Sequence, residues 1–424
     1  MAASTEKKFD LVVFGASGFT GQFVVEEVAR VTEDPNFKWA VAGRSESKMT
    51  AVLKQAELRT GKSLDGIEVL IADVTDEDSM AALCKQTKLL LNCVGPYRFW
   101  GEQTVKACVE NGAHHIDISG EPQFLEKMQL KYHDKAKENN VYVVGSCGFD
   151  SIPADMGVEF MRQKFPGEVN TVENYLTFHT GSKGMVIHYA TWQSAIHGFA
   201  DQDKLKEIRK VLNTQPLPKL KPRLQRRGMA FFSPDVNKWC VPFLGADASV
   251  VRRSQKFHYE KETQRPIQFG AYVTVAGLLS LISLFVFGSI FGMLAKFKFG
   301  RTLLEKYPKL FTLGLVSHEG PSREQMEDVS FSMTFYGEGF SKKGENTEKH
   351  DMKMVTKVTG PEPGYVTTPI AMVQAAKILL SEQSLLPNSG GVYSPGAAYA
   401  KTTLIEKLVE HGIKFTVVSE ATQK

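Results

Sequence analysis

The sequence contains little cysteine, and its cysteines lack the spacing of a metal or redox motif. Five occur among 424 residues, and none belongs to a CxxC pair. Structural zinc sites and small disulfide frameworks require paired or regularly spaced cysteines. We therefore expect a reduced intracellular chain without a bound metal. No secretory signal peptide is recognisable in the first ten residues, which lead into a run broken at once by glycines.

An excess of charge of one sign is also missing. The 51 basic and 47 acidic residues leave a net charge of +4, whereas nucleic-acid-binding domains usually carry a strong basic excess. We therefore expect no nucleic-acid partner. With 42% hydrophobic and 23% charged residues, the composition is that of a globular protein. Its length suggests about two to three domains.

Several well-known catalytic motifs are absent. There is no HExxH, no GxSxG and no Walker sequence, so zinc hydrolysis, serine acyl transfer and P-loop phosphoryl transfer have no support. None of the twelve tyrosines has a lysine at the fourth following position. This excludes the Tyr–Lys arrangement by which short-chain dehydrogenases transfer a proton.

The first 150 residues alternate short apolar runs with segments of helical periodicity. The apolar runs are 9–14, 39–42, 67–72, 89–94, 115–118 and 141–145. Such alternation is typical of a parallel sheet wound with helices. We therefore predict an α/β protein whose residues 1–150 form a Rossmann-type domain.

The first expected strand ends in a turn with three glycines at a GxxGxxG spacing, and a helical segment follows it. Glycines at such a turn let the backbone bend tightly and approach a pyrophosphate, whose charge lies against the amides of the helix N-terminus. An ordinary tight turn is the alternative, but the order of strand, turn and helix favours a dinucleotide site. The residues expected to form it are Gly15, Ala16, Ser17, Gly18, Phe19, Thr20 and Gly21.

The residues after the second expected strand indicate which dinucleotide is bound. Enzymes that prefer NAD usually place an acidic residue there for the ribose 2′-hydroxyl, but this sequence has Arg44 and Ser45. A guanidinium suits a 2′-phosphate, so we expect NADP(H) to be preferred over NAD(H). The alternative for Arg44 is a solvated loop residue. Asp73 and Val74 are expected near the adenine, although an Asp at this place often only caps a helix.

The later strands supply candidates for the nicotinamide end of the site. Gly95, Pro96 and Tyr97 follow the fourth strand and Asp117 ends the fifth; ligands bind at this edge of doubly wound sheets. We expect Tyr97, Asp117 and Asp150 to be catalytic. The alternatives are that Tyr97 stacks on the nicotinamide and that Asp150 only holds the domain junction. The wider candidate set adds Glu121, Ser151 and Asp155.

Five segments stand in the order that marks a known family: GASGFTGQ, AGRS, NCVGPYRFWGE, VENGAHHIDISGE and SCGFDSIPADMG. Together with GPEPGYVTTPIAMVQAA and the C-terminal GGVYSPGAAYAK, they extend over nearly the whole chain. The sequence resembles the saccharopine dehydrogenase-like oxidoreductases, the animal relatives of saccharopine reductase and of bacterial trans-acting enoyl reductases. The resemblance implies a Rossmann domain, a following α+β domain and association with lipid droplets or membranes.

Residues 151–365 are expected to form this α+β domain, with an apolar helical insertion at 266–295. The insertion has thirty residues without a charge, and about 20 suffice to span a bilayer. Strand-like segments at 249–260 and 330–341 indicate, however, that both of its ends belong to one domain. Residues 366–424 are expected to form helices and a strand that can pack back on the first domain.

Basic residues flank the apolar insertion on both sides, which places both of its ends on the cytosolic side of a membrane. We expect 266–295 to enter one leaflet of a membrane or a lipid-droplet monolayer, as a hairpin or a monotopic segment bent near Gly288 or Gly292. A buried core helix or a homodimer interface is the alternative, because its glycines also permit close packing. A basic connection at 215–227 is expected to attract anionic head groups, unless it is only a solvated loop.

Together these features predict an NADP(H)-dependent oxidoreductase that acts on an apolar or lipid-linked small molecule. It would work at a membrane or lipid-droplet surface that faces the cytosol. A catalytically silent NADP-binding scaffold on lipid droplets is the rival hypothesis, supported by the missing Tyr–Lys pair. A true saccharopine reductase is a third.

Overall fold

The computed structural model describes residues 6–200, 202–212, 215–345 and 347–423. Contacts within the chain divide it into two units, each formed from several segments. The first unit consists of Met1–Gly148, Gly364–Tyr393 and Lys401–Leu404. The second unit consists of Phe149–Pro363, Ser394–Ala400 and Ile405–Lys424. The C-terminal segment expected at 366–424 is therefore divided between the two units.

The first unit is built on a seven-stranded parallel sheet. Its first six strands are β1 (Phe9–Phe14), β2 (Trp39–Gly43), β3 (Glu68–Ile71), β4 (Thr87–Asn92), β5 (His114–Asp117) and β6 (Tyr142–Val144). They lie in the order β3-β2-β1-β4-β5-β6 with every pair parallel. This is the strand order of dinucleotide-binding folds, so the predicted Rossmann-type sheet is confirmed. A short strand that the sequence did not indicate, β15 (Gly391–Tyr393), extends the sheet beyond β6.

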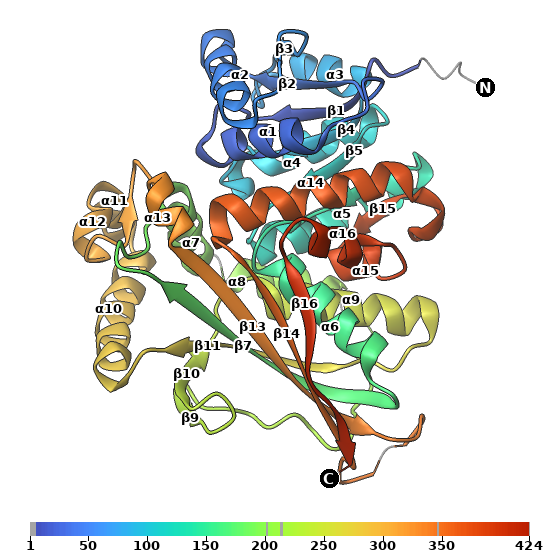
Figure 1. Ribbon diagram of the computed structural model, residues 1–424, viewed down its shortest axis with the longest axis vertical. Helices are drawn as coiled ribbons and strands as arrows, with labels where there is room; N and C mark the ends of the chain where they lie inside the picture. Colours follow the sequence, from blue (N-terminus) through green and yellow to red (C-terminus); the bar gives the residue numbers. More distant parts are fainter. Residues whose placement is uncertain (1–5, 201, 213–214, 346, 424) are drawn as a thin grey trace. The chain divides into compact units, whose positions relative to one another are not determined.

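Helices alternate with the strands of the first unit (Figure 1). They are α1 (Phe19–Val31), α2 (Glu46–Thr60), α3 (Glu77–Gln86), α4 (Tyr97–Glu110) and α5 (Pro122–Glu138). The C-terminal part of the chain adds α14 (Thr368–Ser381), which packs against α1 and β4. Except for β3, the strands β1 to β6 are largely buried, as expected where helices flank a parallel sheet.

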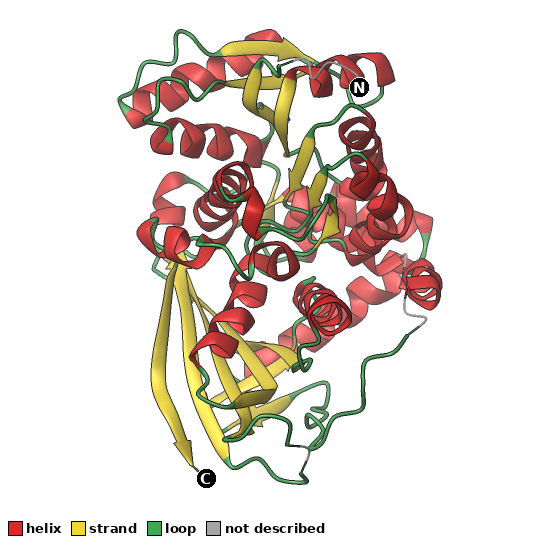
Figure 2. Ribbon diagram, turned by 90° about the vertical axis from the view of Figure 1, so that its right-hand side faces the viewer, coloured by secondary structure: helices red, strands yellow, loops and turns green. Residues whose placement is uncertain are grey.

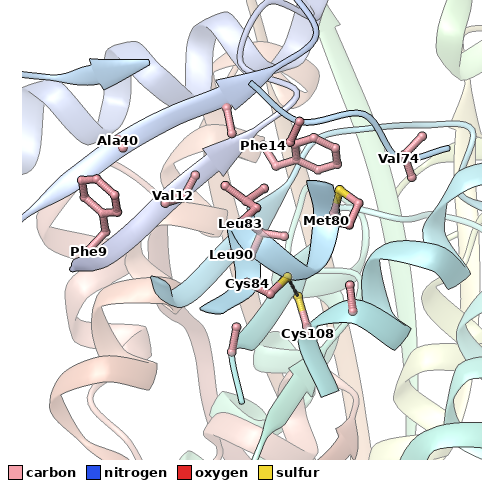
Figure 3. Packing of buried hydrophobic residues seen from close by; sticks show 14 residues of the cluster. Phe9, Val12, Phe14, Ala40, Val74, Met80, Leu83, Cys84, Leu90 and Cys108 are labelled. Carbon is pink, nitrogen blue, oxygen red and sulfur yellow. Dashed lines mark hydrogen bonds between the residues drawn. The ribbon is translucent and has the colours of Figure 1, made fainter. Parts of the chain in front are cut away.

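One hydrophobic core of this unit lies where β1, β2 and β4 meet the helices α3 and α4 (Figure 3). Val12 and Leu90 are fully buried there, and Met80 is 1% exposed. Cys84 of α3 and Cys108 of α4 are also fully buried in this cluster. The helix α3 precedes β4 in the chain and α4 follows it. Because both helices pack in this core, the core fixes the position of the turn between β4 and α4.

The second unit contains a mixed seven-stranded sheet in the order β16-β14-β13-β7-β11-β10-β9. The strands are β7 (Glu168–Thr180), β9 (Phe231–Ser233), β10 (Lys238–Pro242), β11 (Gln268–Val275), β13 (Val329–Phe340), β14 (Met352–Pro361) and β16 (Lys414–Gln423). Only β7 and β11 pair in parallel; the other neighbours are antiparallel. Figure 2 shows helices against one part of this sheet, which agrees with the predicted α+β class.

Three helices of the second unit lie together: α6 (Ser151–Lys164), α9 (Asp247–Glu262) and α15 (Pro395–Tyr399). The helix α6 approaches the sheet at Gly157, where an added Cβ would lie 2.3 Å from the ring of Phe335. The segment 249–260 was expected to be a strand and is instead part of α9. Its buried residues, such as Val250, Val251 and His258, recur at the spacing of a helix. The adjacent β-branched residues Val250 and Val251 had suggested a strand instead.

The apolar segment differs from the expected hairpin. Residues 268–275 of the expected insertion form β11, and the helix that follows, α10 (Leu278–Lys296), is continuous. It has no break at Gly288 or Gly292, so the predicted bend is wrong. Only 11% of its most apolar window is buried in the protein, so it is no core helix of this chain.

The helix α10 belongs to a small group with α7 (Tyr189–Ala200) and α11 (Lys298–Lys306). Phe291 packs on Trp192 with ring centroids 5.0 Å apart, and Ala295 is fully buried. The remaining helices and strands of this unit are β8 (Ile187–His188), α8 (Gln202–Leu212), α12 (Pro308–Phe311), β12 (Val316–Ser317), α13 (Arg323–Glu327) and α16 (Leu404–Glu410). The helix α10 therefore has one narrow packed face and an otherwise exposed surface.

Several basic residues that were expected to attract lipid have partners within the second unit. Arg227 makes two contacts of 2.9 and 2.7 Å with Glu173, and Lys221 pairs with Glu348 at 2.6 Å. Arg265 bonds to Glu168 at 3.3 Å. These side chains stabilise the second unit. The strand β11 separates the upstream basic residues from α10. The basic residues that directly adjoin α10 therefore lie downstream of it.

Candidate cofactor-binding site

The glycine turn after β1 has the geometry that its sequence predicts. Gly15 has a φ of +82°, a region that favours glycine. Its carbonyl accepts a hydrogen bond from the Gly18 amide at 2.9 Å. A Cβ added to Gly21 would lie 2.2 Å from that same carbonyl oxygen. The three glycines therefore let the first turn of α1 sit directly against the end of β1.

The N-terminus of α1 is arranged to receive an anion. Gly18 caps the helix, and no side chain occupies the cap position. Ser17 and Gly18 are exposed, while Ala16 is fully buried and its amide bonds to Ala42 at 3.3 Å. Backbone amides at such an open helix start attract phosphate groups. The predicted pyrophosphate position is thus compatible with the structure.

Aromatic packing holds the first turn of α1 in place. The ring of Phe19 meets Tyr365 edge to face with centroids 4.8 Å apart, and Phe23 lies 5.6 Å from the same ring. Tyr365 precedes α14 and belongs to the first unit. Phe19 therefore contributes its backbone to the turn, while its side chain packs against Tyr365, a residue from the C-terminal part of the chain.

The candidate selector for the 2′-phosphate lies at the end of the next strand. Arg44 is exposed directly after β2, and Ser45 caps α2 by accepting from the Lys48 amide at 3.5 Å. Asp73, after β3, accepts bonds of 2.9 Å from the amide and hydroxyl of Thr75. These bonds, with a smaller contribution from Arg44, lower the pKa of Asp73. Arg44 is thus exposed outside the packed core, and its contact with a 2′-phosphate remains a prediction.

Val74 was expected beside the adenine. Its side chain is 8% exposed and belongs to the core cluster of the first unit. Asp73 uses one carboxylate oxygen to shape the turn that leads into α3. Contact of these two residues with an adenine therefore remains a prediction, and the structure gives both of them a structural role as well.

The turn after β4 is held by a carboxylate that the sequence placed only in the wider candidate set. Glu121 accepts hydrogen bonds from the amide of Tyr97 at 3.0 Å and from the amide of Arg98 at 3.3 Å. The Arg98 guanidinium also pairs with it at 2.7 Å, and both side chains are nearly buried. Glu121 thereby fixes the start of α4, and with it the turn formed by Gly95 and Pro96. Arg98 was missed because a charged residue in a first helical turn looks solvated from sequence.

Tyr97 lies deeper than expected. Its hydroxyl donates to the carbonyl of Asn92 at 2.7 Å, and only 7% of the residue is exposed. Burial, together with the charge of Asp117, raises the pKa of Tyr97 well above its usual value. This geometry favours a role in shaping the turn after β4. Proton transfer by Tyr97 remains a prediction.

Asp117 joins the ends of β5 and β6. Its Oδ1 accepts from the amides of Ser119 at 2.9 Å and of Ser146 at 3.1 Å, and its carbonyl accepts from Cys147. It is 1% exposed. The neighbouring His115 is fully buried, and burial lowers its pKa to about 3. Asp117 thus organises the loops at the cofactor edge, and its catalytic role remains a prediction.

The remaining predicted catalytic residue, Asp150, belongs to the second unit. It stands at the start of α6 with a φ of +73°, and its side chain makes no capping bond. Desolvation raises its pKa to about 7. A carboxyl group with such a pKa can give or take a proton near neutral pH. Of the three predicted catalytic side chains, Asp150 is the one whose electrostatics suit proton transfer.

Asp150 has two acidic neighbours in the second unit. Asp155 is fully buried, and its Oδ2 accepts from the Ser254 hydroxyl at 2.6 Å and the Gly396 amide at 2.7 Å. Asp247 on α9 is 1% exposed, with neither carboxylate oxygen hydrogen-bonded. Desolvation, then the charges of Asp150 and Asp155, raises the pKa of Asp247 well above its usual value. Sequence reasoning missed Asp247, because only the fold brings α9 beside α6.

Among the described residues, no group of three or more His, Cys, Asp or Glu side chains is arranged to hold a metal ion. The candidate site combines an open helix start, an exposed arginine after β2 and two turns fixed by Glu121 and Asp117. All of these lie after the carboxyl ends of parallel strands, the edge at which doubly wound sheets bind dinucleotides.

Comparison with known proteins agrees with this geometry. Residues 11–144 match the family model of the saccharopine dehydrogenase NADP binding domain. The chain is 50% identical over 426 residues to the human saccharopine dehydrogenase-like oxidoreductase, covering 99% of each chain. The chain belongs to the saccharopine dehydrogenase-like oxidoreductase family. Another member is a Caenorhabditis elegans protein named Lipid droplet localized protein, 38% identical over 97% of this chain and 99% of that one.

The fold of the family extends over both units. The apo saccharopine dehydrogenase (L-Glu forming) of Saccharomyces cerevisiae matches 96% of this chain and 99% of its own, with a TM-score of 0.54 at 11% identity. At that identity the likeness establishes the fold alone. The oxidoreductase therefore combines an NADP-binding Rossmann unit with a second sheet, as the sequence predicted.

NADP(H), when bound, supplies or accepts a hydride, and the protein contributes position and electrostatics. The backbone from Gly15 to Gly21 would hold the pyrophosphate, with Arg44 and Ser45 beside the 2′-phosphate. The residues fit this role, because a Cβ at Gly15 would clash with Val94 and a Cβ at Gly21 with the Gly15 carbonyl, so glycines permit the tight turn that leaves the amides of the helix start open. The turn at Gly95 and Pro96 would lie beside the nicotinamide ribose.

Proposed function

We propose that this oxidoreductase transfers a hydride between NADP(H) and an apolar or lipid-linked substrate at the surface of a lipid droplet or membrane. The protein is intracellular in this proposal, and its catalytic units face the cytosol. The single observation that carries the proposal is the exposed apolar helix α10 on an NADP-binding oxidoreductase. Such a surface is unstable in water and stable in a lipid monolayer.

The exposed apolar residues of α10 form most of its surface. Leu279 is 82% exposed and Met293 60%, and the rest of the set are Leu278, Ile282, Leu284, Phe285, Val286 and Ile290. The exposed side chains continue beyond the helix with Phe297, Phe299, Leu310 and Leu313. We define these residues together as the apolar surface. Burial of each large aliphatic side chain contributes roughly 1.5–3 kcal/mol, so a few of them suffice to bind a lipid phase.

Topology favours insertion from one side. The strand that leads into α10, β11, and the strand β13 that follows the helical group both pair with β7 in one sheet. A helix that crossed a bilayer would separate these two strands on opposite sides. We therefore propose that α10 lies in one leaflet, which suits the single phospholipid layer of a droplet.

Charge next to α10 supports the same orientation. Lys296 ends α10, and Lys298 and Lys306 lie on α11, near exposed Phe297 and Phe299. Long basic side chains and aromatic rings are common at the boundary between acyl chains and water. The lipid-droplet name of the nematode relative supports the location independently.

The location can be tested with artificial droplets of triolein covered by phosphatidylcholine and phosphatidylserine. The wild-type protein is expected to float with them. Leu279→Asp combined with Met293→Asp should reduce the bound fraction at least about tenfold, because two apolar contacts become charges. Leu244→Asp is the matched control, since Leu244 is 91% exposed outside the apolar surface.

A second measurement separates lipid binding from dimer formation. If α10 instead packs against a second copy, the double variant will become monomeric in light scattering while droplet binding stays unchanged. That result would overturn the proposed surface role. Unchanged flotation of a stably folded double variant would overturn it as well.

The reaction can be tested with NADPH-loaded protein and three substrate classes: enoyl thioesters, long-chain ketones and saccharopine. We expect turnover of an apolar carbonyl or enoyl compound, and a loss of at least about tenfold in kcat for Asp150→Asn, in the range of general acid–base catalysis. Exposed Asp65→Asn is the control. Cofactor binding without turnover of any of the three would instead favour the silent scaffold.

A further inference from the structure

Two buried thiols in the first unit lie in direct contact. The Sγ of Cys84, near the end of α3, is 3.6 Å from the Sγ of Cys108 in α4, and both residues are fully buried (Figure 3). A disulfide requires a distance of about 2.05 Å. The two sulfur atoms are therefore adjacent and unbonded.

The sequence gives no sign of this pair. Twenty-four residues separate the two cysteines, and no CxxC spacing exists. The other three cysteines are Cys93, Cys147 and Cys240. The Sγ of Cys147 lies 3.5 Å from the carbonyl oxygen of Val144, which is a backbone atom. The packing of α3 against α4 on β4 brings the pair together.

A basic group lies beside the pair. Lys7 donates to the carbonyl of Cys84 at 2.9 Å and to that of Asn111 at 2.8 Å. Burial raises the pKa of the Cys108 thiol well above its usual value, and the Lys7 ammonium opposes this effect. Lys7 also lines a pocket of about 700 Å³, together with exposed Lys88 and Gly112.

We propose that Cys84 and Cys108 form a reversible dithiol–disulfide modification site whose oxidant is a small hydroperoxide. One thiolate attacks a peroxide oxygen, which gives a sulfenic acid and releases an alcohol or water. The second thiol then attacks that sulfur, the S–S bond forms, and water leaves. Two thiols and one hydroperoxide thus yield one disulfide, one alcohol and one water.

The bridge would close a ring that contains β4 and the turn at Gly95, Pro96 and Tyr97. It would therefore tie α3 to α4, the helix that begins at the proposed nicotinamide end of the site. An external dithiol reverses the reaction by thiol–disulfide exchange.

The test uses the full-length protein in its native state. The protein is exposed to hydrogen peroxide, quenched with catalase, denatured, alkylated and digested without reduction. We expect a linked peptide pair that contains Cys84 and Cys108, about 2 Da lighter than the two free peptides, and its loss after dithiothreitol. Two fewer thiols should be alkylated than in the untreated protein.

Variants distinguish this pair from other thiols. Cys84→Ala and Cys108→Ala should each abolish the linked peptide, whereas Cys147→Ala, at another fully buried cysteine, should leave it unchanged. Full alkylation of the peroxide-treated wild type would overturn the proposal without reference to any variant. So would a linkage that joins other cysteines, or oxidation of Cys84 and Cys108 only to separate sulfinic acids.

Discussion

The carboxyl group of Asp155 makes the stability of the second unit depend on pH in an unusual direction. Asp155 is fully buried, and desolvation raises its pKa from 3.8 to about 6. The unfolded chain therefore releases this proton near pH 4, while the native protein retains it up to about pH 6. Between these values the native state binds more protons, so this group lowers stability as pH rises through the window.

The size of the effect follows from the difference between the two pKa values. Each pKa unit corresponds to about 1.4 kcal/mol, so ionised Asp155 costs the native state roughly 3 kcal/mol above pH 7. Asn occupies the same space, and its oxygen can still accept from Ser254 and Gly396. Asp155→Asn should therefore match the wild type near pH 4 and exceed its unfolding free energy by about 3 kcal/mol above pH 7.

The assay is urea unfolding between pH 4 and 8, followed by fluorescence and circular dichroism, with the difference between variant and wild type plotted against pH. Asp65→Asn, at an exposed position, should give a flat difference. Ser254→Ala removes a donor to the Asp155 carboxylate, so it should lower stability mainly above pH 6. A difference between Asp155→Asn and wild type that does not change with pH would refute the reasoning.

Three further outcomes follow from the site. Gly21→Ala should weaken NADPH binding at least about tenfold, because its Cβ would lie 2.2 Å from the Gly15 carbonyl oxygen. The matched control is Gly66→Ala, where nothing lies within 4 Å of the added Cβ. Equal NADPH affinities of the two variants in a fluorescence titration would contradict the proposed role of the glycine turn. Arg44→Ala should reduce NADPH affinity by about tenfold or more and leave NADH affinity nearly unchanged; an equal loss for both cofactors would remove Arg44 as the selector. Asp247→Asn should raise the unfolding free energy at pH 7.5, since it removes a buried carboxylate without hydrogen-bonded oxygens, and a loss of stability there would show that the charge is needed.

Local patterns were sufficient for much of the first unit. The strands of the Rossmann sheet, the glycine turn and the position of Arg44 depend on short segments whose apolar period and glycine spacing are visible in one stretch of sequence. The apolar helix was also recognisable from its composition. Its start was not, because a strand such as β11 is as uncharged as the helix that follows it.

The tertiary structure decided which side chains share one environment. Glu121 reaches back to the start of α4, Asp247 joins Asp155 through the packing of α9 on α6, and Cys84 meets Cys108 only because α3 and α4 cover the same strand. These pairs are far apart in sequence and have no local period, so no pattern marks them. Sequence by itself determined the fold class, the cofactor turn and the presence of an apolar helix. Burial and long-range packing, which set pKa values and contacts, belong to the folded chain alone.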